Sequence, residues 1–348
     1  MHLIAYGFNK TMYPDCDGMP ARVIAVHKER YKLVCENGEC YGRLKTREYY
    51  VEDEDFPTVG DFVIIDYNSV GDSRIVKTLS RRTVFMRKDP NPGRGEQAVA
   101  ANFDYVFIMQ SLNHDYNVKR LERYLTLAWQ SGAQPVIVLT KADLLEDFSG
   151  QVSTAELYAM GVPVHAVSAR TGIGLSELGK YVSPQKTVVF LGSSGVGKSS
   201  LVNALAEEEI MATNGIREDD SKGRHTTTHR ELILLKNGAM IIDTPGMRSL
   251  GMWDVTEGMG NAFADVERFL GRCKFTDCRH ESEPGCAIKA AIESGELTRE
   301  RFESYLALKK EARYSEDKEG FLRDKKEWHK ALSKGTRQLK KTNPKHRR

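Results

Sequence analysis

The 348-residue sequence predicts a multidomain protein with a small all-β barrel, a central α/β domain and a mainly helical C-terminal domain. Short β-rich runs crowd the first 80 residues, apolar runs alternate with helical segments from residue 104, and cysteines cluster after residue 270. We expect these boundaries: 1–85 for the barrel, 86–103 for a linker, 104–255 for the α/β domain, 256–320 for the helical domain and 321–348 for a basic tail.

The composition is typical of a globular chain, with 40% hydrophobic and 28% charged residues. No window approaches the roughly 20 apolar residues of a membrane span, and the N-terminal residues lack an apolar segment of signal-peptide length. We therefore expect a cytoplasmic protein without a membrane partner. Residues 321–348 hold 11 Lys and Arg residues against 2 Asp and Glu residues, which indicates a polyanionic partner such as nucleic acid. A solvated tail without a partner is the alternative.

Residues 20–80 contain five short β-rich runs, at 21–27, 30–36, 39–44, 61–66 and 73–79. The dipeptide Asn37-Gly38, between the second run and the third, is typical of a tight hairpin turn. Five strands in about 60 residues favour a Greek-key barrel such as an OB-fold, which often binds oligonucleotides. A purely structural barrel would show the same pattern.

From residue 104 the sequence is typical of strands that alternate with helices. The strand candidates are residues 104–110, 135–141, 163–169, 186–192, 231–236 and 239–245. Between the first two, residues 117–130 place apolar side chains on one helical face and begin at Asn117, a residue type that favours the helix N-cap. Buried strands that alternate with helices predict a mostly parallel, doubly wound sheet.

A phosphate-binding loop follows the strand candidate at 186–192. The pattern G-x-x-x-x-G-K-[ST] is filled by Gly192, Ser193, Ser194, Gly195, Val196, Gly197, Lys198 and Ser199, and Ser200 continues into a helical stretch. Backbone N–H groups of such a loop surround a polyphosphate, and the helix N-terminus adds positive potential. We expect Lys198 to bridge the β- and γ-phosphates and Ser199 to hold Mg²⁺.

Two downstream segments complete the predicted phosphate site. Asp243 ends an apolar strand and is suited to hold Mg²⁺ through water, and the N–H group of Gly246 can sense the γ-phosphate. Between the phosphate loop and Asp243, the loop at 223–228 is rich in threonine, and Thr226 or Thr227 can complete the Mg²⁺ shell in the triphosphate state. An ordinary surface loop is the alternative for this segment.

Two further motifs concern the choice of base. They consist of Thr140, Lys141, Ala142 and Asp143, and of Ser168, Ala169 and Arg170. The first resembles the [NT]-K-x-D guanine motif, in which a carboxylate accepts from N1–H and the 2-amino group, donors that adenine lacks. The second resembles the loop whose backbone meets guanine O6. Each motif alone is weak, but both together with a phosphate loop predict a GTPase; an ATPase or kinase is the less favoured alternative.

The order of these motifs is unusual, because Asp143 precedes Lys198 by 55 residues, whereas the base motifs follow the phosphate loop in most small GTPases. A circular permutation explains this order, since the termini of a domain often lie close together. The order TKAD, SAR, GSSGVGKSS, GRHTTT and DTPGMR, between a β-barrel and a cysteine cluster, closely resembles the ribosome small subunit-dependent GTPase A family. Thr140 stands where many members have Asn.

This resemblance implies an N-terminal OB-fold, a circularly permuted GTPase domain and a C-terminal zinc domain. It also implies hydrolysis of GTP to GDP, stimulated by the small ribosomal subunit, during late assembly of that subunit and with rRNA binding. A nucleotide-gated RNA-binding module with a non-ribosomal target fits the barrel and the basic tail equally well. We further expect a monomer.

The cysteine cluster supplies four residues suited to hold a metal ion: Cys273, Cys278, His280 and Cys286. Three thiolates and one imidazole within 14 residues, with no obvious open position, predict one structural, tetrahedral Zn²⁺ per chain. Coincidental buried cysteines are the alternative. Cys16, Cys35 and Cys40 lack a His partner, and we expect them to be ordinary reduced thiols.

The residue that orients the attacking water is less evident. Met247 follows the glycine of the DTPG segment, where many GTPases place a Gln that orients the water. Because methionine cannot take this role, intrinsic hydrolysis should be slow and depend on another residue or on a partner. His225 is the nearest candidate, since imidazole can orient or deprotonate water near neutral pH, and the resemblance implies a catalytic His in this loop. Arg248 is a weaker candidate for stabilising charge.

Overall fold

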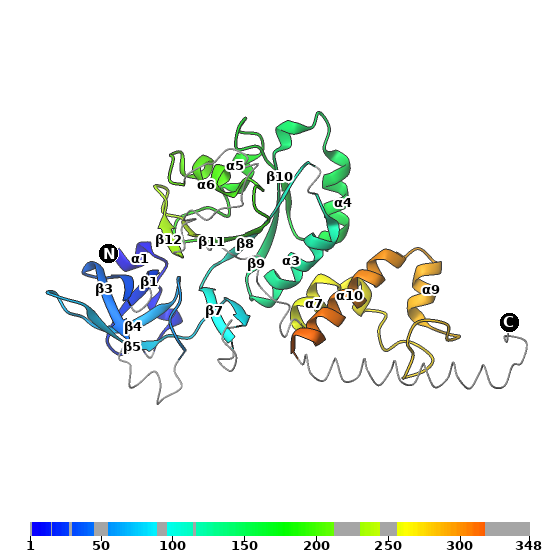
Figure 1. The fold of residues 1–348 in the computed structure, drawn as a ribbon, viewed down its shortest axis with the longest axis horizontal. Coiled ribbons are helices and arrows are strands. Elements are labelled where there is room, and N and C mark those ends of the chain that lie inside the picture. The colour runs from blue at the N-terminus through cyan, green and yellow to red at the C-terminus, as the bar shows by residue number, and fades with distance from the viewer. Residues whose placement is uncertain are drawn as a thin grey trace, which may run out of the picture. The chain divides into compact units, whose positions relative to one another are not determined.

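The computed structural model describes residues 2–14, 16–27, 30–44, 55–88, 96–113, 116–211, 230–243 and 256–316 (Figure 1). The chain folds into two compact units, one of Met1–Leu250 with Thr256–Arg268 and one of Gly251–Val255 with Phe269–Arg348. Among the described residues, no helix has both the length and the apolar character that crossing a membrane requires. The predicted basic tail at 321–348 lies outside the described residues.

Five strands close into a barrel in the N-terminal part of the first unit (blue in Figure 1). After α1 (His2–Ala5) and η1 (Lys10–Met12) come β1 (Met19–His27), β2 (Arg30–Cys35), β3 (Gly38–Leu44), β4 (Phe62–Asp66) and β5 (Ser73–Thr78). Their order is β1-β2-β3-β5-β4, and the pairing of β1 with β4 closes the ring around the buried Val23, Leu33 and Ile75. The expected hairpin is confirmed: Cys35 pairs with Gly38, whose φ of +104° favours glycine.

A two-stranded hairpin follows the barrel. It is formed by β6 (Val84–Lys88) and β7 (Glu96–Ala101), which are antiparallel. The composition predicts a linker over residues 86–103, but residues 96–101 form a strand. This strand pairs with β6 and buries the apolar side chains of Val99, Ala100 and Ala101, which stabilises it. Close by, Phe103 stacks on Phe85 with 4.8 Å between the ring centroids.

Six strands form the α/β part of the main sheet. They are β8 (Tyr105–Ser111), β9 (Gln134–Thr140), β10 (Val164–Ala166), β11 (Thr187–Gly192), β12 (Glu231–Leu234) and β13 (Met240–Asp243). Their order is β10-β9-β8-β11-β13-β12, and all neighbours are parallel except β12 and β13, which confirms the mostly parallel sheet. Because parallel strands run the same way, the chain leaves β9, β10, β11 and β13 at one edge of the sheet.

Helices pack against this sheet. They are α3 (Val118–Gln130), α4 (Ser149–Ala159), α5 (Leu175–Leu178) and α6 (Lys198–Ala206), with the short turn η2 (Ala142–Leu144). Helix α3 begins as expected, because Asn117 Oδ1 accepts from the N–H group of Arg120 at 3.0 Å. Leu178 of α5 and Leu201 of α6 join Phe107 of β8 in one buried core, and α3 packs against β8 and β9.

The barrel and the parallel sheet belong to the same unit and are joined directly. β1 pairs with β12 at Ala25 and Glu231, so a barrel strand continues the sheet. Arg22 of β1 is 1% exposed and donates to Asn102 O at 2.8 Å and to Thr187 Oγ1 at 3.1 Å. Burial lowers the pKa of Arg22 to about 10. Its hydrogen bonds compensate for the loss of hydration and connect the barrel to the start of β11.

The helices after residue 255 are divided between the two units. α7 (Thr256–Ala262) and α8 (Ala264–Glu267) belong to the first unit. A Cβ on Gly258 would lie 2.3 Å from Thr126 O, so the glycine permits α7 to approach α3 closely. The second unit contains α9 (Ala287–Glu293) and α10 (Arg299–Glu316).

Candidate nucleotide site and metal centre

A cavity of about 220 Å³ lies where the segments after β9, β10 and β11 meet. Its lining residues are Thr140, Lys141, Asp143, Leu144, Val167, Ser168, Ala169, Arg170, Gly197, Ser200 and Leu201. The structure therefore brings both predicted base motifs to the end of the phosphate loop. Leu144, Val167 and Leu201 were not predicted from the sequence, although each flanks a predicted motif. Such apolar walls suit the flat face of a base.

Thr140 connects the first base motif to the phosphate loop. Its hydroxyl lies 2.5 Å from Val196 O and 3.3 Å from Gln110 O, and the residue is 3% exposed. The chain then turns at Lys141, whose φ of +60° lies in the left-handed region. This turn carries Ala142 and Asp143 to the edge of the sheet. A Thr thus links the two loops at the position where many members of the resembling family have Asn.

Thr140→Val should weaken nucleotide binding, because valine keeps the shape of threonine but leaves the Val196 carbonyl without its donor. We expect a loss of GDP affinity of about fivefold to tenfold, measured by titration calorimetry. Thr140→Ser, which keeps the hydroxyl, is the matched control and should bind as the parent chain does. Equal affinities of the two variants would contradict this role of the hydroxyl.

The two base motifs are joined by a buried serine. Ser168 Oγ donates to Asp143 Oδ1 at 2.6 Å, and it accepts from the N–H groups of Arg170 and Thr171, both at 3.2 Å. Ser168 has no exposed surface. Its hydroxyl therefore holds the carboxylate at the cavity and shapes the following turn, in which Ala169 also lines the cavity.

The phosphate loop turns on two glycines, Gly195 with φ of +72° and Gly197 with φ of +101°. Helix α6 begins directly afterwards at Lys198, and Lys198 Nζ lies 2.5 Å from Asp243 Oδ1 at the end of β13. The expected phosphate-binding ammonium and the expected Mg²⁺-holding carboxylate are therefore adjacent. The rest of the motif runs from the last residue of β11 into the first turn of α6: Gly192, Ser193, Ser194, Val196, Ser199 and Ser200.

Several predicted site residues lie outside the described part of the chain. They are His225, Thr226, Thr227 and Gly246, together with Met247 and Arg248. Their roles in catalysis and in γ-phosphate sensing stay predictions.

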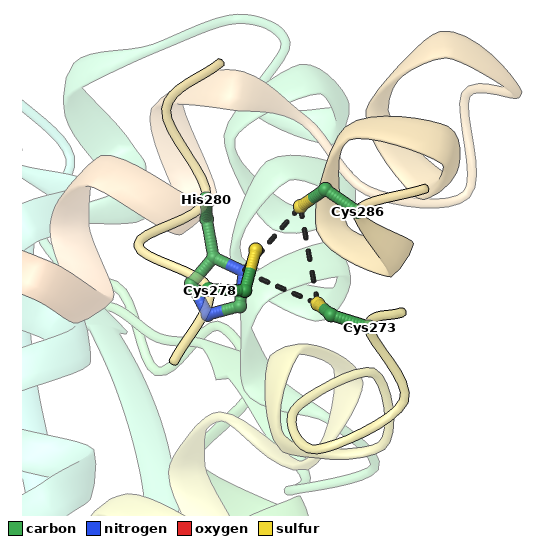
Figure 2. A group of neighbouring side chains, drawn as sticks. All are labelled: Cys273, Cys278, His280 and Cys286. Atoms are coloured by element: carbon green, nitrogen blue, oxygen red, sulfur yellow. Dashed lines mark hydrogen bonds between the residues drawn. The ribbon is translucent and has the colours of Figure 1, made fainter. Parts of the chain in front are cut away.

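The four predicted metal ligands come together in the second unit (Figure 2). The ligand atoms of Cys273, Cys278, His280 and Cys286 all lie within 4.8 Å of one another. His280 Nδ1 is 3.5 Å, 3.6 Å and 3.4 Å from the Sγ atoms of the three cysteines in sequence order, and Cys273 Sγ is 3.9 Å from Cys286 Sγ. Figure 2 shows these side chains pointing toward one another. The cluster is compatible with a structural metal site.

Local contacts hold this cluster in place. The N–H group of Ala287 donates to Cys273 Sγ at 3.4 Å, and the His280 ring lies edge-on to Phe302 of α10 with 5.7 Å between the centroids. Main-chain N–H groups, foremost that of Arg279, lower the pKa of Glu283 to about 2. Glu283 therefore stays ionised and orders the turn at residues 279–283, which contains His280.

Two comparisons of the sequence agree on the family. Residues 78–253 match the family model described as RsgA GTPase. A protein of Listeria monocytogenes serotype 4b named small ribosomal subunit biogenesis GTPase RsgA 2 is 47% identical, over 99% of this chain and 100% of the relative. A protein of Methanosarcina acetivorans named small ribosomal subunit biogenesis GTPase RsgA is 43% identical, over 82% of this chain and 78% of the relative.

Solved structures resemble the fold as well. YjeQ from Thermotoga maritima matches with a TM-score of 0.63 and 26% identity, covering 83% of this chain and 96% of that one. YloQ, described as a circularly permuted GTPase, matches with a TM-score of 0.58 and 27% identity, covering 86% and 96%. With its phosphate loop, base motifs and permuted order, the chain belongs to the RsgA family of GTPases.

Proposed function

We propose that this GTPase hydrolyses GTP to GDP and phosphate as a late-stage assembly factor of the small ribosomal subunit. The observation that carries the proposal is the identity of 47% over the full length of a relative named small ribosomal subunit biogenesis GTPase. The cavity supports the same activity, because both expected base motifs line it together with Gly197 and Ser200 of the expected phosphate loop. The partners are then the small subunit with its rRNA, and the protein acts in the cytoplasm as a monomer.

In this proposal the base is read by two loops. Asp143 accepts from the N1–H and 2-amino groups of guanine, and the main chain at Ala169 meets guanine O6. The 2.6 Å hydrogen bond from Ser168 supports this assignment, because it fixes the carboxylate beside the second loop. Of the remaining motif residues, Thr140, Lys141 and Arg170 line the cavity, and Ala142 is buried next to Asp143 in the chain.

The phosphates are bound at the other side of the site. Lys198 binds the β- and γ-phosphates, and the loop from Gly192 to Gly197 surrounds them with N–H groups. The Ser199 hydroxyl and the Asp243 carboxylate are oxygen donors of the kind that Mg²⁺ prefers, so these residues hold the ion. When bound, Mg²⁺ neutralises charge on the β- and γ-phosphates. The adjacency of Lys198 and Asp243 supports a shared phosphate and metal site.

Hydrolysis then depends on the segments around the γ-phosphate. We assign His225 to orienting the attacking water, and Thr226, Thr227 and Gly246 to the γ-phosphate and its ion. These assignments rest on the sequence motifs and on the family. Because Met247 cannot orient water, fast hydrolysis depends on the placement of His225 at the γ-phosphate, which a bound partner can bring about.

The ligand spacing supports zinc as the metal of the second unit. With Zn–S of about 2.3 Å and Zn–N of about 2.05 Å, a tetrahedron has S···S edges of about 3.8 Å and S···N edges of about 3.6 Å. The distances here are 3.9 Å for one S···S pair and 3.4–3.6 Å for the S···N pairs. Three thiolates and an imidazole are soft donors that suit Zn²⁺ without an open position.

GTP hydrolysis by the chain should rise by about a hundredfold when purified small ribosomal subunits are added, because the bound subunit places His225 at the γ-phosphate and completes the catalytic site. The measurement is phosphate release at saturating GTP with small subunits, with large subunits or with neither. Lys198→Ala should stay inactive in all three conditions. Equal stimulation by large subunits, or none by small subunits, would contradict the ribosomal role and favour another target.

A further inference from the structure

The second base-recognition loop, residues 167–174, follows a short edge strand. β10 spans only Val164–Ala166 and lies at the end of the sheet, where it pairs with β9. A three-residue strand with a partner on one side contributes few ladder hydrogen bonds, so the ladder fixes the loop only weakly. Contacts outside the ladder therefore decide where the loop lies.

Two side chains bridge the stems of this loop. His165, on β10 before the loop, is buried, and its Nδ1 lies 2.7 Å from Glu177 Oε2 on α5, after the loop. Its Nε2 lies 3.1 Å from the Tyr181 hydroxyl. Tyr181 is buried with its ring edge-on to Tyr105 and Phe107 of β8. A neutral imidazole that donates from Nδ1 and accepts at Nε2 satisfies both partners.

Main-chain contacts also join the two ends of this loop. The N–H group of Ser168 donates to Ile173 O, and the N–H group of Gly172 donates to Ser168 O, both at 2.9 Å. Gly174 has φ of +68°, and a Cβ there would lie 2.2 Å from Ala166 O, so only glycine permits this approach. The start of α5 therefore lies against the end of β10, where the contact between His165 and Glu177 joins them.

We propose that His165 and Glu177 are positioning residues for guanine recognition. By holding α5 against β10, they fix the main chain of Ala169 and Arg170 at the wall of the cavity. Neither residue lines the cavity; both act through the geometry of the loop. The inference rests on the proposed assignment of this loop to guanine O6.

His165 and Glu177 affect the main-chain contact with guanine O6 more than the contact of Asp143 with guanine N1–H and the 2-amino group. Two main-chain hydrogen bonds hold Val167: its N–H group donates to Leu139 O of β9 at 2.8 Å, and its carbonyl accepts from the N–H group of Ala142 in the first base motif at 3.1 Å. These bonds hold Val167, the first residue of the loop, independently of α5. The next residue, Ser168, is held at Asp143 by its own side-chain hydrogen bond of 2.6 Å. The main chain at Ala169 lies beyond Val167, in the turn that the Ser168 hydroxyl shapes and that Gly172 and Ile173 join to α5.

Glu177→Ala should reduce the affinity for GDP about fivefold, the size of one lost main-chain hydrogen bond to O6. The affinity for 6-thio-GDP, whose sulfur is a poorer acceptor, should change little, so the preference for oxygen at position 6 disappears. The preference for GDP over IDP, which the 2-amino contact of Asp143 creates, should remain. Dissociation constants of the three nucleotides, measured by titration calorimetry on the full-length chain, test this.

The conservative variant Glu177→Gln keeps an acceptor for His165 Nδ1 and should restore the parent preference. Glu156→Ala, an exposed acid on α4, is the matched control and should change nothing. The Glu177 side chain is 62% exposed, so its removal should leave the fold intact, which circular dichroism checks. A Glu177→Ala variant that keeps the preference for oxygen, or loses both preferences equally, overturns the inference. A parent chain without either preference would refute the proposed guanine site instead.

Discussion

Asp143→Asn should convert the protein from one that binds GTP to one that prefers xanthosine triphosphate. The carboxylate accepts two hydrogen bonds from guanine, whereas an amide presents an N–H group to one of these donors. Xanthine carries a carbonyl at position 2, so it accepts from the same amide. Because a site built for specific hydrogen bonds rejects a mismatched partner strongly, we expect GTP affinity to fall by roughly a thousandfold.

The variant should fold, because an asparagine oxygen can still accept the hydrogen bond that Ser168 Oγ donates at 2.6 Å. Titration calorimetry with GDP and xanthosine diphosphate measures the exchange. Glu146→Gln, an exposed acid three residues further on, removes the same charge and should leave the affinity for GDP unchanged. Unchanged GDP affinity of Asp143→Asn would remove Asp143 from the site.

Much of the nucleotide site was predictable because its chemistry is local in the sequence. The phosphate loop needs glycines at fixed offsets from Lys198, and Gly195 and Gly197 do take the positive φ values that this loop requires. The hydrogen bonds between the loops were not predictable. Thr140 and Val196 are 56 residues apart, and only the topology of the sheet brings them to 2.5 Å.

The fold shows the same difference between features that are local in the sequence and contacts between distant residues. The strands at 104–110 and 135–141 carry apolar runs that predict a buried sheet, and the sheet is there. Residues 96–101 instead follow a Pro- and Gly-rich stretch, so their composition does not reveal that they pair with β6. Similarly, nothing local to residues 256–262 indicates that α7 packs on α3. That contact depends on Gly258 meeting the backbone at Thr126.

Removal of the metal should unfold the segment at 273–286 and leave guanine nucleotide binding intact. Among the four ligands only Cys286 is buried, so the apolar contacts of the cluster are too few to replace the ion. Helix α9 begins directly after Cys286, and His280 contacts Phe302 of α10, so the disorder should spread into both helices. Zinc contributes about 10 kcal/mol or more to the folding of small zinc domains, so the segment at 273–286 should unfold completely when the metal is removed.

Elemental analysis of freshly purified, unchelated protein should find one zinc per chain, and hydrogen exchange after chelation should show lost protection in 273–286. Cys278→Ser should reproduce the effect of chelation, whereas Cys16→Ser, which removes a thiol outside the cluster, should keep the metal.

The affinity for GDP should be unaffected by chelation, because all residues that line the cavity belong to the first unit and all four metal ligands to the second. Protein without zinc, or protection that survives chelation, would count against a structural metal, since a cluster that stays folded without its ion does not need it.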